Sequence, residues 1–206
     1  IVTQGVGTPM TSFMSTGTPL HVGTTPLYPY DLAKAKQLLS DAGFPNGFET
    51  TLDLLAGNED EIGIGTALQQ MWGQAGVKLD LQQEDNATRT GQYRNGTLDM
   101  RLSVWTDDIA DPNEIASYFL YYPNIQSNHS GWKNDEVDKL FEASQSEVDP
   151  KKRAAEYAQM QQIYNATGPI VSLYETGYPV ALRDNVQSFG QIPLANNIFR
   201  ATWLKK

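Results

Sequence analysis

The chain has 206 residues, 40% of them hydrophobic and 10% aromatic, which is enough to bury a real core in one domain or slightly more. Its formal net charge of -9, with no basic run longer than residues 151–153, argues against nucleic acid as a partner. Cysteine is absent, which excludes disulfides and thiolate metal sites, and no window of 18 apolar residues could span a membrane.

Residues 1–30 hold several glycines and prolines and show no sustained period of 2 or 3.6 residues. They therefore indicate an irregular connector. A connector of this length is unusual inside a compact domain, so we expect it to run against another part of a larger protein. The chain begins without methionine or a signal-like segment, so we expect either a mature product or a piece of something longer.

Regular structure is predicted from Asp31 onward, where apolar residues recur with helical spacing and Gly43 can end the helix in the left-handed conformation. Alternating residues then predict a strand over residues 48–54 and another over 77–81. Between them lies a second predicted helix, with Gly76 as its stop. Two strands separated by such a helix predict a parallel β-α-β unit and an α/β fold.

The later part of the chain carries further patterns. They predict a short helix or turn over 85–95, a strand over 98–104, an aromatic-rich helix over 115–122 that Pro123 ends, helices that begin at Asn134 and at Asp149-Pro150, and strands over 170–174 and 179–182. The two consecutive helices should pack antiparallel. The tail is apolar almost to its end, so we expect it to need something to pack on.

The corner between the last strand of this sheet and the aromatic-rich helix carries three carboxylates. Asp111 followed by Pro112 predicts an N-cap and a first helical residue, because a carboxylate accepts from free amides and proline has no amide hydrogen to lose. Trp105, Asp107 and Asp108 remain at the end of a strand, where α/β proteins usually bind ligands. An aromatic wall and a free carboxylate suit a cationic ligand group.

Catalytic and metal chemistry have little support in the sequence. His21 and His129 both fall in predicted loops, and no Gly-x-Ser-x-Gly elbow is present, which argues against a Ser-His-Asp hydrolase. The two histidines lack metal-ligand spacing. Gly63-Ile64-Gly65 lacks the third glycine of a dinucleotide loop. We therefore expect no enzyme, no resident metal and no cofactor.

An ordered set of motifs resembles the peptide/nickel/opine-type solute-binding proteins of ABC importers, extracellular solute-binding protein family 5. The set covers about residues 28–185 and consists of residues 30–39, in which Leu32 stands where proline is usual, Ala42 to Phe48, Leu68-Gln69-Gln70-Met71-Trp72 with Gly76-Val77, Gly96 to Met100, Trp105 to Pro112, Asn134 to Leu140, and the helix from Arg153 to Pro169. Each motif is weak alone, and the specificity lies in their order.

The resemblance implies a periplasmic-binding-protein-like lobe with a mixed, mostly parallel sheet flanked by helices. Family members are similar in having two lobes around a cleft, and this chain resembles the later half. Residues 1–30 would then be a hinge-side connector, 31–185 the C-terminal ligand-binding lobe, and 186–206 a tail that returns toward the missing N-terminal lobe. An export signal and any lipid anchor would lie on the absent part.

The function implied is the substrate-binding component of an ABC importer, which captures peptides or peptide-like cationic solutes in an interlobe cleft for transmembrane permease subunits. The location implied is periplasmic, or extracellular and membrane-anchored in a Gram-positive bacterium. An opine or metal-chelate ligand stays open, with His129 beside a nickel complex, as does a stand-alone interaction domain without ligand capture.

At the corner, the resemblance implies that Asp108 pairs with the α-ammonium group of a ligand, the alternative being that it only caps a turn. Trp105 and Thr106 would line the ligand, although Trp105 could equally be a core aromatic. Asp107 replaces a small residue common in the family and adds a charge that favours a more cationic or water-bridged ligand. Dipeptide-binding relatives use an arginine after the strand that ends here at 54–57, and none stands there.

Overall fold

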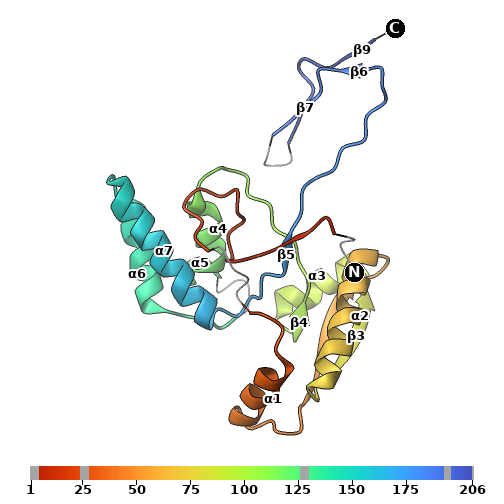
Figure 1. The fold of residues 1–206 in the computed structure, drawn as a ribbon, viewed down its shortest axis with the longest axis vertical. Coiled ribbons are helices and arrows are strands. Elements are labelled where there is room, and N and C mark those ends of the chain that lie inside the picture. The colour runs from red at the N-terminus through yellow and green to blue at the C-terminus, as the bar shows by residue number, and fades with distance from the viewer. Residues whose placement is uncertain (1–4, 24–27, 126–129, 193–195, 206) are drawn as a thin grey trace. The chain divides into compact units, whose positions relative to one another are not determined.

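A computed structural model describes residues 5–23, 28–125, 130–192 and 196–205. The chain, drawn in Figure 1, forms two compact units. Unit 1 contains Gly5 and residues 28–104, and unit 2 contains the described residues of 6–23, 105–125 and 130–205. The predicted α/β fold is confirmed, and the division at residues 30 and 185 stays a prediction.

Unit 1 is built on a three-stranded parallel sheet in the order β3-β2-β4. Its strands are β2 (Glu49–Leu55), β3 (Lys78–Glu84) and β4 (Met100–Arg101). Pairing of β2 with β3 runs from Glu49 opposite Lys78 to Leu55 opposite Glu84. The parallel β-α-β unit predicted from the alternating residues is therefore confirmed.

Three helices accompany this sheet, and each begins at a side chain that accepts a backbone hydrogen bond. They are α1 (Leu32–Asp41) after Asp31, α2 (Glu59–Gln74) after Asn58, and α3 (Asn86–Asn95) after Asp85. The core of unit 1 joins Leu52, Leu54 and Leu79 to residues of α2, namely Ile62, Leu68 and Trp72. Met71 of α2 is 37% exposed, and α1 has no buried residue.

The helix α2 and the strand β3 are positioned by glycines at two points. Gly65 faces the sheet, and a Cβ there would lie 3.0 Å from Leu54 Cδ1. Gly47 (φ +78) and Gly76 (φ +94) bring two turns together, since a Cβ on Gly47 would lie 1.8 Å from the Gly76 carbonyl oxygen. Directly after this contact, Lys78 N donates to Phe48 O at 2.8 Å and opens the β2–β3 ladder.

The strand predicted over 98–104 is much shorter than its alternating pattern indicates. Pairing with β2 is confined to Met100 and Arg101, opposite Leu52 and Asp53. The register explains this, because β2 ends two residues beyond Asp53 and offers no partner to Val104. Val104, in the last position of the predicted strand, is accordingly 90% exposed.

Unit 2 is helical at its centre. It contains α4 (Pro112–Phe119), α5 (Tyr122–Ile125), α6 (Asp135–Ser144) and α7 (Pro150–Thr167). The predicted starts of α6 at Asn134 and of α7 at Asp149 are confirmed. The helices α6 and α7 lie side by side (Figure 1). They are antiparallel as predicted, since Gln159 Nε2 donates to Glu136 Oε1 at 2.5 Å while Arg153 Nε donates to the Ser144 carbonyl at 3.3 Å.

The aromatic-rich helix ends earlier than the sequence predicts. The helix α4 stops at Phe119, and Pro123 lies inside the separate short helix α5. Leu120 N and Tyr121 N both donate to the Ala116 carbonyl, and Tyr122 N donates to the Asp138 carboxylate of α6 at 2.8 Å. These bonds end α4 before the proline is reached. None of the helices in the described ranges has the length and apolar composition needed to cross a bilayer.

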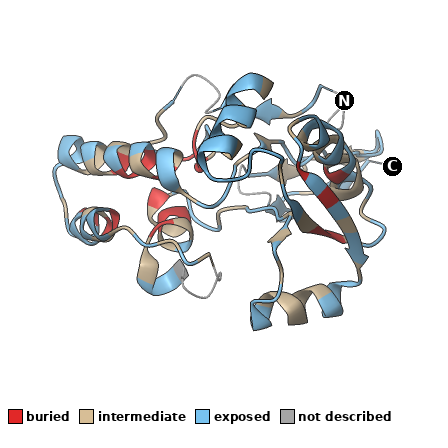
Figure 2. Cartoon of the chain, turned by 90° about the horizontal axis from the view of Figure 1, so that it is seen from below, coloured by how far each residue is buried: buried red, intermediate tan, exposed pale blue. Residues whose placement is uncertain are grey.

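The N-terminal segment differs most from its expected character. Within the predicted connector, β1 (Thr8–Pro9) pairs antiparallel with β5 (Tyr174–Glu175). Phe13 and Met14 are 2% and 1% exposed and belong to the core of unit 2. The other buried members of that core are Ile115, Ala116, Leu120, Val137, Phe141, Tyr157, Met160 and Tyr164 (red in Figure 2). The segment thus packs against α4, α6 and α7 of this same chain.

One buried side chain, Gln161 of α7, holds this segment in place. Its Oε1 accepts from Ser12 Oγ at 2.8 Å and from Val22 N at 3.0 Å. Its Nε2 donates to the Leu20 carbonyl at 2.9 Å and to the Tyr157 carbonyl at 3.1 Å. Leu20 adopts φ +64, an unfavourable value for a side chain with Cβ, and the bond to Gln161 fixes its carbonyl.

Two predicted strands in the last part of the chain are reduced or absent. Of the predicted run 170–174 only Tyr174 pairs, and β5 continues to Glu175, because its partner β1 is two residues long and one of them is a proline without an amide hydrogen. Residues 179–182 form no strand. The tail instead forms β6 (Val186–Gln187) with β9 (Trp203–Leu204), and β7 (Gly190–Gln191) with β8 (Asn197–Ile198).

Candidate functional site

The corner that follows β4 belongs to unit 2 and leads into α4. Glu114, in the first turn of α4, reaches back to it. The Glu114 Oε2 atom accepts from Asp108 N at 2.8 Å and from Ile109 N at 3.0 Å. Both amides of the bend are therefore satisfied by a single carboxylate, which fixes the backbone on which Asp108 sits.

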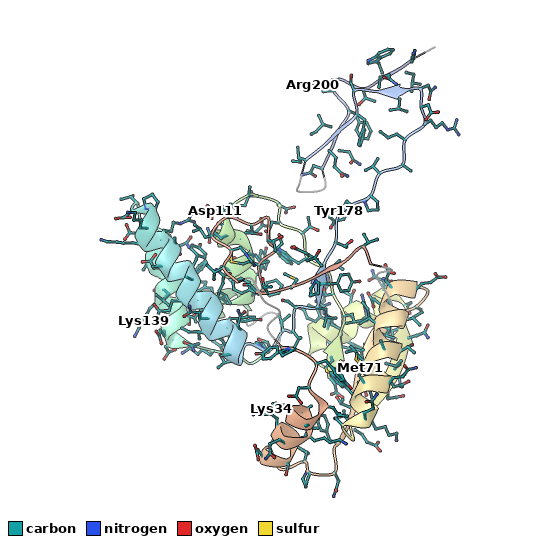
Figure 3. The ribbon with its side chains drawn as sticks, viewed as in Figure 1. Lys34, Met71, Asp111, Lys139, Tyr178 and Arg200 are labelled. Carbon is teal, nitrogen blue, oxygen red and sulfur yellow. The ribbon has the colours of Figure 1, made fainter. Side chains whose placement is uncertain are left out.

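Asp111 and Pro112 form the start of α4 (Figure 3 labels Asp111). Asp111 Oδ1 accepts from Asn113 N at 2.9 Å and from Arg153 Nη2 of α7 at 2.8 Å. Partial burial acts to raise the pKa of Asp111, but the hydrogen bonds from Arg153 and Asn113 and the guanidinium charge outweigh it and lower the pKa. The Asp111 carboxylate is therefore ionised and already bonded to Asn113 and Arg153. Its role is structural, and it is not free to bind a further group.

Asp107 is also occupied, although by neutral groups. Its Oδ1 accepts from the indole Nε1 of Trp105 at 2.9 Å, and its Oδ2 accepts from Thr18 Oγ1 at 3.2 Å. Partial burial raises the pKa of Asp107. The two hydrogen bonds act in the opposite direction, and the nearby carboxylates of Glu114 and Asp108 add to the rise.

The sequence left two positions open for Trp105, a packed core aromatic or an exposed wall of the corner, and the structure shows features of both. Its ring packs on Tyr118 at a centroid distance of 4.7 Å and meets Phe119 edge-on at 5.8 Å. The residue is nevertheless 41% exposed, so part of the indole faces solvent. The next residue, Thr106, shares a hydrogen bond with the hydroxyl of Tyr178, which Figure 3 labels.

Asp108 differs from the other two aspartates of the corner, Asp107 and Asp111, in being exposed. Its backbone amide is held by Glu114, but its carboxylate accepts no hydrogen bond from the described part of the chain. An exposed, unoccupied carboxylate on a fixed backbone, three residues from a half-exposed indole, can attract a cationic group by charge and by contact with an aromatic ring. The ligand role that the sequence predicts for this corner stays a prediction.

Sequence reasoning missed several partners of this corner. Glu114 stands three residues after Asp111, a capping-box spacing that could have drawn attention to it, although it bonds the amides of Asp108 and Ile109 instead. Thr18 and Tyr178 lie far away in the sequence and carry no local signal. They become visible only when unit 2 is folded.

Unit 1 contains an arginine close to the end of β2, where the sequence showed none. Arg89 of α3 forms an ion pair with Glu61 at 2.6 Å, and both side chains are largely buried. Glu61 also accepts from Leu55 N at 2.7 Å, so this carboxylate ties the arginine to the strand end. Arg89 is thereby engaged within the fold and does not present a free cation at this position.

Other candidate sites are weaker. An open hollow of about 390 Å³ in unit 1 is lined by α2 and β3 and contains none of the predicted site residues. No group of three or more histidine, aspartate or glutamate side chains that could hold a metal ion occurs among the residues described. His21 Nε2 forms a hydrogen bond with Thr11 Oγ1 at 3.0 Å, and His129 lies outside the described residues.

Comparison with known proteins provides evidence on the family of this chain that does not depend on the geometry of the corner. The family model "Bacterial extracellular solute-binding proteins, family 5 Middle" matches residues 1–127. The chain is 30% identical over 177 residues to heme-binding protein A of Haemophilus influenzae, covering 84% of this chain and 32% of that protein. It therefore spans about a third of the length of this relative.

Two solved structures are similar in fold and sequence. The structure of HbpA2 from Haemophilus parasuis has a TM-score of 0.80 and 27% identity, over 98% of this chain and 41% of that one. The periplasmic binding protein DppA of Helicobacter pylori, solved in complex with the peptide STSA, has a TM-score of 0.76 and 26% identity. That match covers 83% of this chain and 34% of DppA.

Proposed function

Because the chain belongs to the bacterial extracellular solute-binding proteins of family 5, we propose that it is part of the substrate-binding component of an ABC importer. It captures a solute in the periplasm or at the outer cell surface and delivers it to the transmembrane subunits of a permease. Residues 31–185 form its ligand-binding lobe, and residues 186–206 return toward a second lobe. The names of its relatives, which include peptide-binding proteins, support this role.

The observation that carries the ligand class is the exposed carboxylate of Asp108 on a backbone fixed by Glu114. We assign Asp108 to the amino group of a peptide or peptide-like cationic solute, with Trp105 and Thr106 beside it. Asp107, Asp108 and Glu114 add negative charge to this corner, and Arg153 is engaged by Asp111. A charge-assisted hydrogen bond of this kind contributes about 1.5 to 3 kcal/mol.

The test is isothermal titration of the full-length receptor with trialanine and N-acetyl-trialanine, together with an opine and a nickel chelate as competing ligand classes. The variant Asp108→Asn keeps the side-chain shape and removes its charge, so it should weaken trialanine by about 10- to 100-fold and leave the acetylated peptide nearly unchanged. Asp60→Asn in the first turn of α2 is the control, because it removes an exposed carboxylate in unit 1.

Each alternative has its own outcome. Equal losses for both peptides would remove the ammonium role and leave Asp108 as a turn residue. If only the opine or only the chelate binds, the ligand would be assigned to that class instead of to peptides. If none of the four compounds binds, the proposal of ligand capture fails and the stand-alone interaction domain is favoured.

A further inference from the structure

The two adjacent carboxylates at the corner have opposite surroundings. Asp108 is exposed, and its carboxylate accepts nothing from the described residues. Asp107 has both oxygens engaged, one by the indole of Trp105 at 2.9 Å and the other by the hydroxyl of Thr18 at 3.2 Å. Adjacent residues of the same type therefore present one available carboxylate and one that the fold already uses.

Thr18 belongs to a firmly held part of the N-terminal segment. It is 7% exposed, and its amide donates to the Ser15 carbonyl at 3.0 Å. A few residues on, Leu20 is bonded to the buried Gln161 of α7. The Asp107 carboxylate therefore links the indole of Trp105 to a segment anchored in the core of unit 2. The indole also packs on Tyr118 and Phe119, and the bond to Asp107 adds a directional contact at its Nε1 atom.

We propose that Asp107 is a positioning residue, which fixes the indole of Trp105 through its Oδ1 and is itself fixed by Thr18, so that Asp108 is the only carboxylate of the pair that meets the ligand. This inference rests on the proposed function for the role of Asp108. The ligand then needs a single positive charge at this corner rather than two. The carboxylate of Asp107 then sets the orientation of the aromatic wall.

The charged groups around Asp107 make the proposal measurable. Glu114 of α4 and Asp108 are the carboxylates that influence it, and Trp105 and Thr18 are its hydrogen-bond donors. Because the indole N–H bonds to the Asp107 carboxylate, protonation of that carboxylate should change the chemical shift of the indole. The pKa of Asp107 lies above its ordinary value of 3.8, so this change should be centred above pH 3.8.

The experiment is an NMR titration of this chain labelled with ¹⁵N at the tryptophan indoles, and it needs no ligand. Its four tryptophans give four indole signals, and Trp105→Phe identifies the relevant one. In the wild type the Trp105 signal should titrate, in Asp107→Asn the titration should be lost, and in Asp108→Asn it should persist. The signals of Trp72 in unit 1 and Trp132 in unit 2 report whether each variant is folded.

Three results would overturn the proposal: a Trp105 signal that does not titrate in the folded wild type, a titration that survives Asp107→Asn, or one that disappears in Asp108→Asn. If Asp107→Asn does not fold, Thr18→Val provides the second test. It removes a hydrogen bond that lowers the pKa of Asp107, so the Trp105 midpoint should move to higher pH. An unchanged midpoint would contradict the assigned link. Failure of these NMR tests would not change the outcome of the calorimetric titrations with Asp108→Asn. The two proposals can therefore fail separately.

Discussion

The attachment of the N-terminal segment to α7 gives the sharpest stability prediction. Gln161 is fully buried and satisfies Ser12, Val22 and Leu20 at once. Gln161→Met keeps the length of the side chain and removes its amide. The hydroxyl of Ser12, itself fully buried, then loses the acceptor for its proton, whereas Val22 and Leu20 are half-buried and can reach water.

The expected cost follows from this difference in burial. A buried polar group without a partner costs about 1 to 3 kcal/mol, and each of the two half-buried bonds contributes about 0.5 to 1.5 kcal/mol. Methionine buries more apolar surface than glutamine, which offsets part of this loss. We expect unit 2 to be destabilised by about 2 to 5 kcal/mol. Gln159→Met is the matched control, because it lies on the same helix, is exposed and loses one bond to Glu136.

Hydrogen exchange measured by mass spectrometry is the appropriate assay, because a chain of two units need not unfold in one step. Peptides covering residues 8–22 should exchange faster in Gln161→Met than in Gln159→Met, while peptides of β3 should not change. In a double-mutant cycle, Ser12→Ala should cost less when Gln161 is already methionine. Equal exchange over 8–22 in both variants would refute the claim that Gln161 holds the segment.

Two further predictions concern a glycine contact and a helix start. In urea unfolding, Gly47→Ala should destabilise unit 1 by about 1 to 3 kcal/mol more than Gly43→Ala. Both positions have positive φ, but only Gly47 faces the Gly76 carbonyl at close range. Equal losses of stability in the two variants would contradict this. Asp111→Ala should cost about 1 to 2 kcal/mol and Asp111→Asn less than about 1, because asparagine keeps the cap and loses only the partly exposed ion pair with Arg153. Since the pKa of Asp111 is lowered from 3.8, the stability that it contributes is complete above pH 3.8 and is lost as the pH falls below this value. The difference in stability between the wild type and Asp111→Asn should therefore shrink in acid. A difference that stays constant with pH would argue against the ion pair.

Features set by neighbouring residues could be predicted from the sequence. The starts of α1, α6 and α7 follow from Asp31, Asn134 and Asp149, whose side chains accept from amides two or three residues ahead. The strands β2 and β3 were predictable because their alternating residues extend over a full strand and a single helix connects them. In each case the decisive interaction lies within a few residues or within one supersecondary unit.

Features that depend on a distant partner could not be predicted. The pattern over 98–104 is that of a strand, but its length is limited by where β2 ends. The N-terminal segment has no periodicity, yet Phe13 and Met14 are buried by helices that begin about a hundred residues later. Pro123 would end a helix if one reached it, but α4 is stopped earlier by bonds to Ala116 and Asp138.

The candidate site divides in the same way. The position of its predicted residues is local, since Trp105, Asp108 and Asp111 all lie in the short stretch that leads into α4. Their separate roles are not local. Asp107 and Asp108 are the same residue type in adjacent positions, and only the bond to Thr18, 89 residues away in the sequence, shows that the first is occupied.

The N-terminal segment both packs in the core of unit 2 and bonds to the predicted ligand-binding corner. A carboxylate that binds a ligand must stay unsatisfied within its own fold, and its neighbour would add repulsion without benefit unless it were satisfied internally. Thr18 and Trp105 satisfy Asp107, Glu114 fixes the backbone of Asp108, and Arg153 occupies Asp111. Thr18 lies on the same segment as Phe13 and Met14, which pack in the core of unit 2, and its bond to Asp107 leaves Asp108 as the available carboxylate. We therefore propose that the segment without sequence periodicity contributes to the candidate site as well as to the fold.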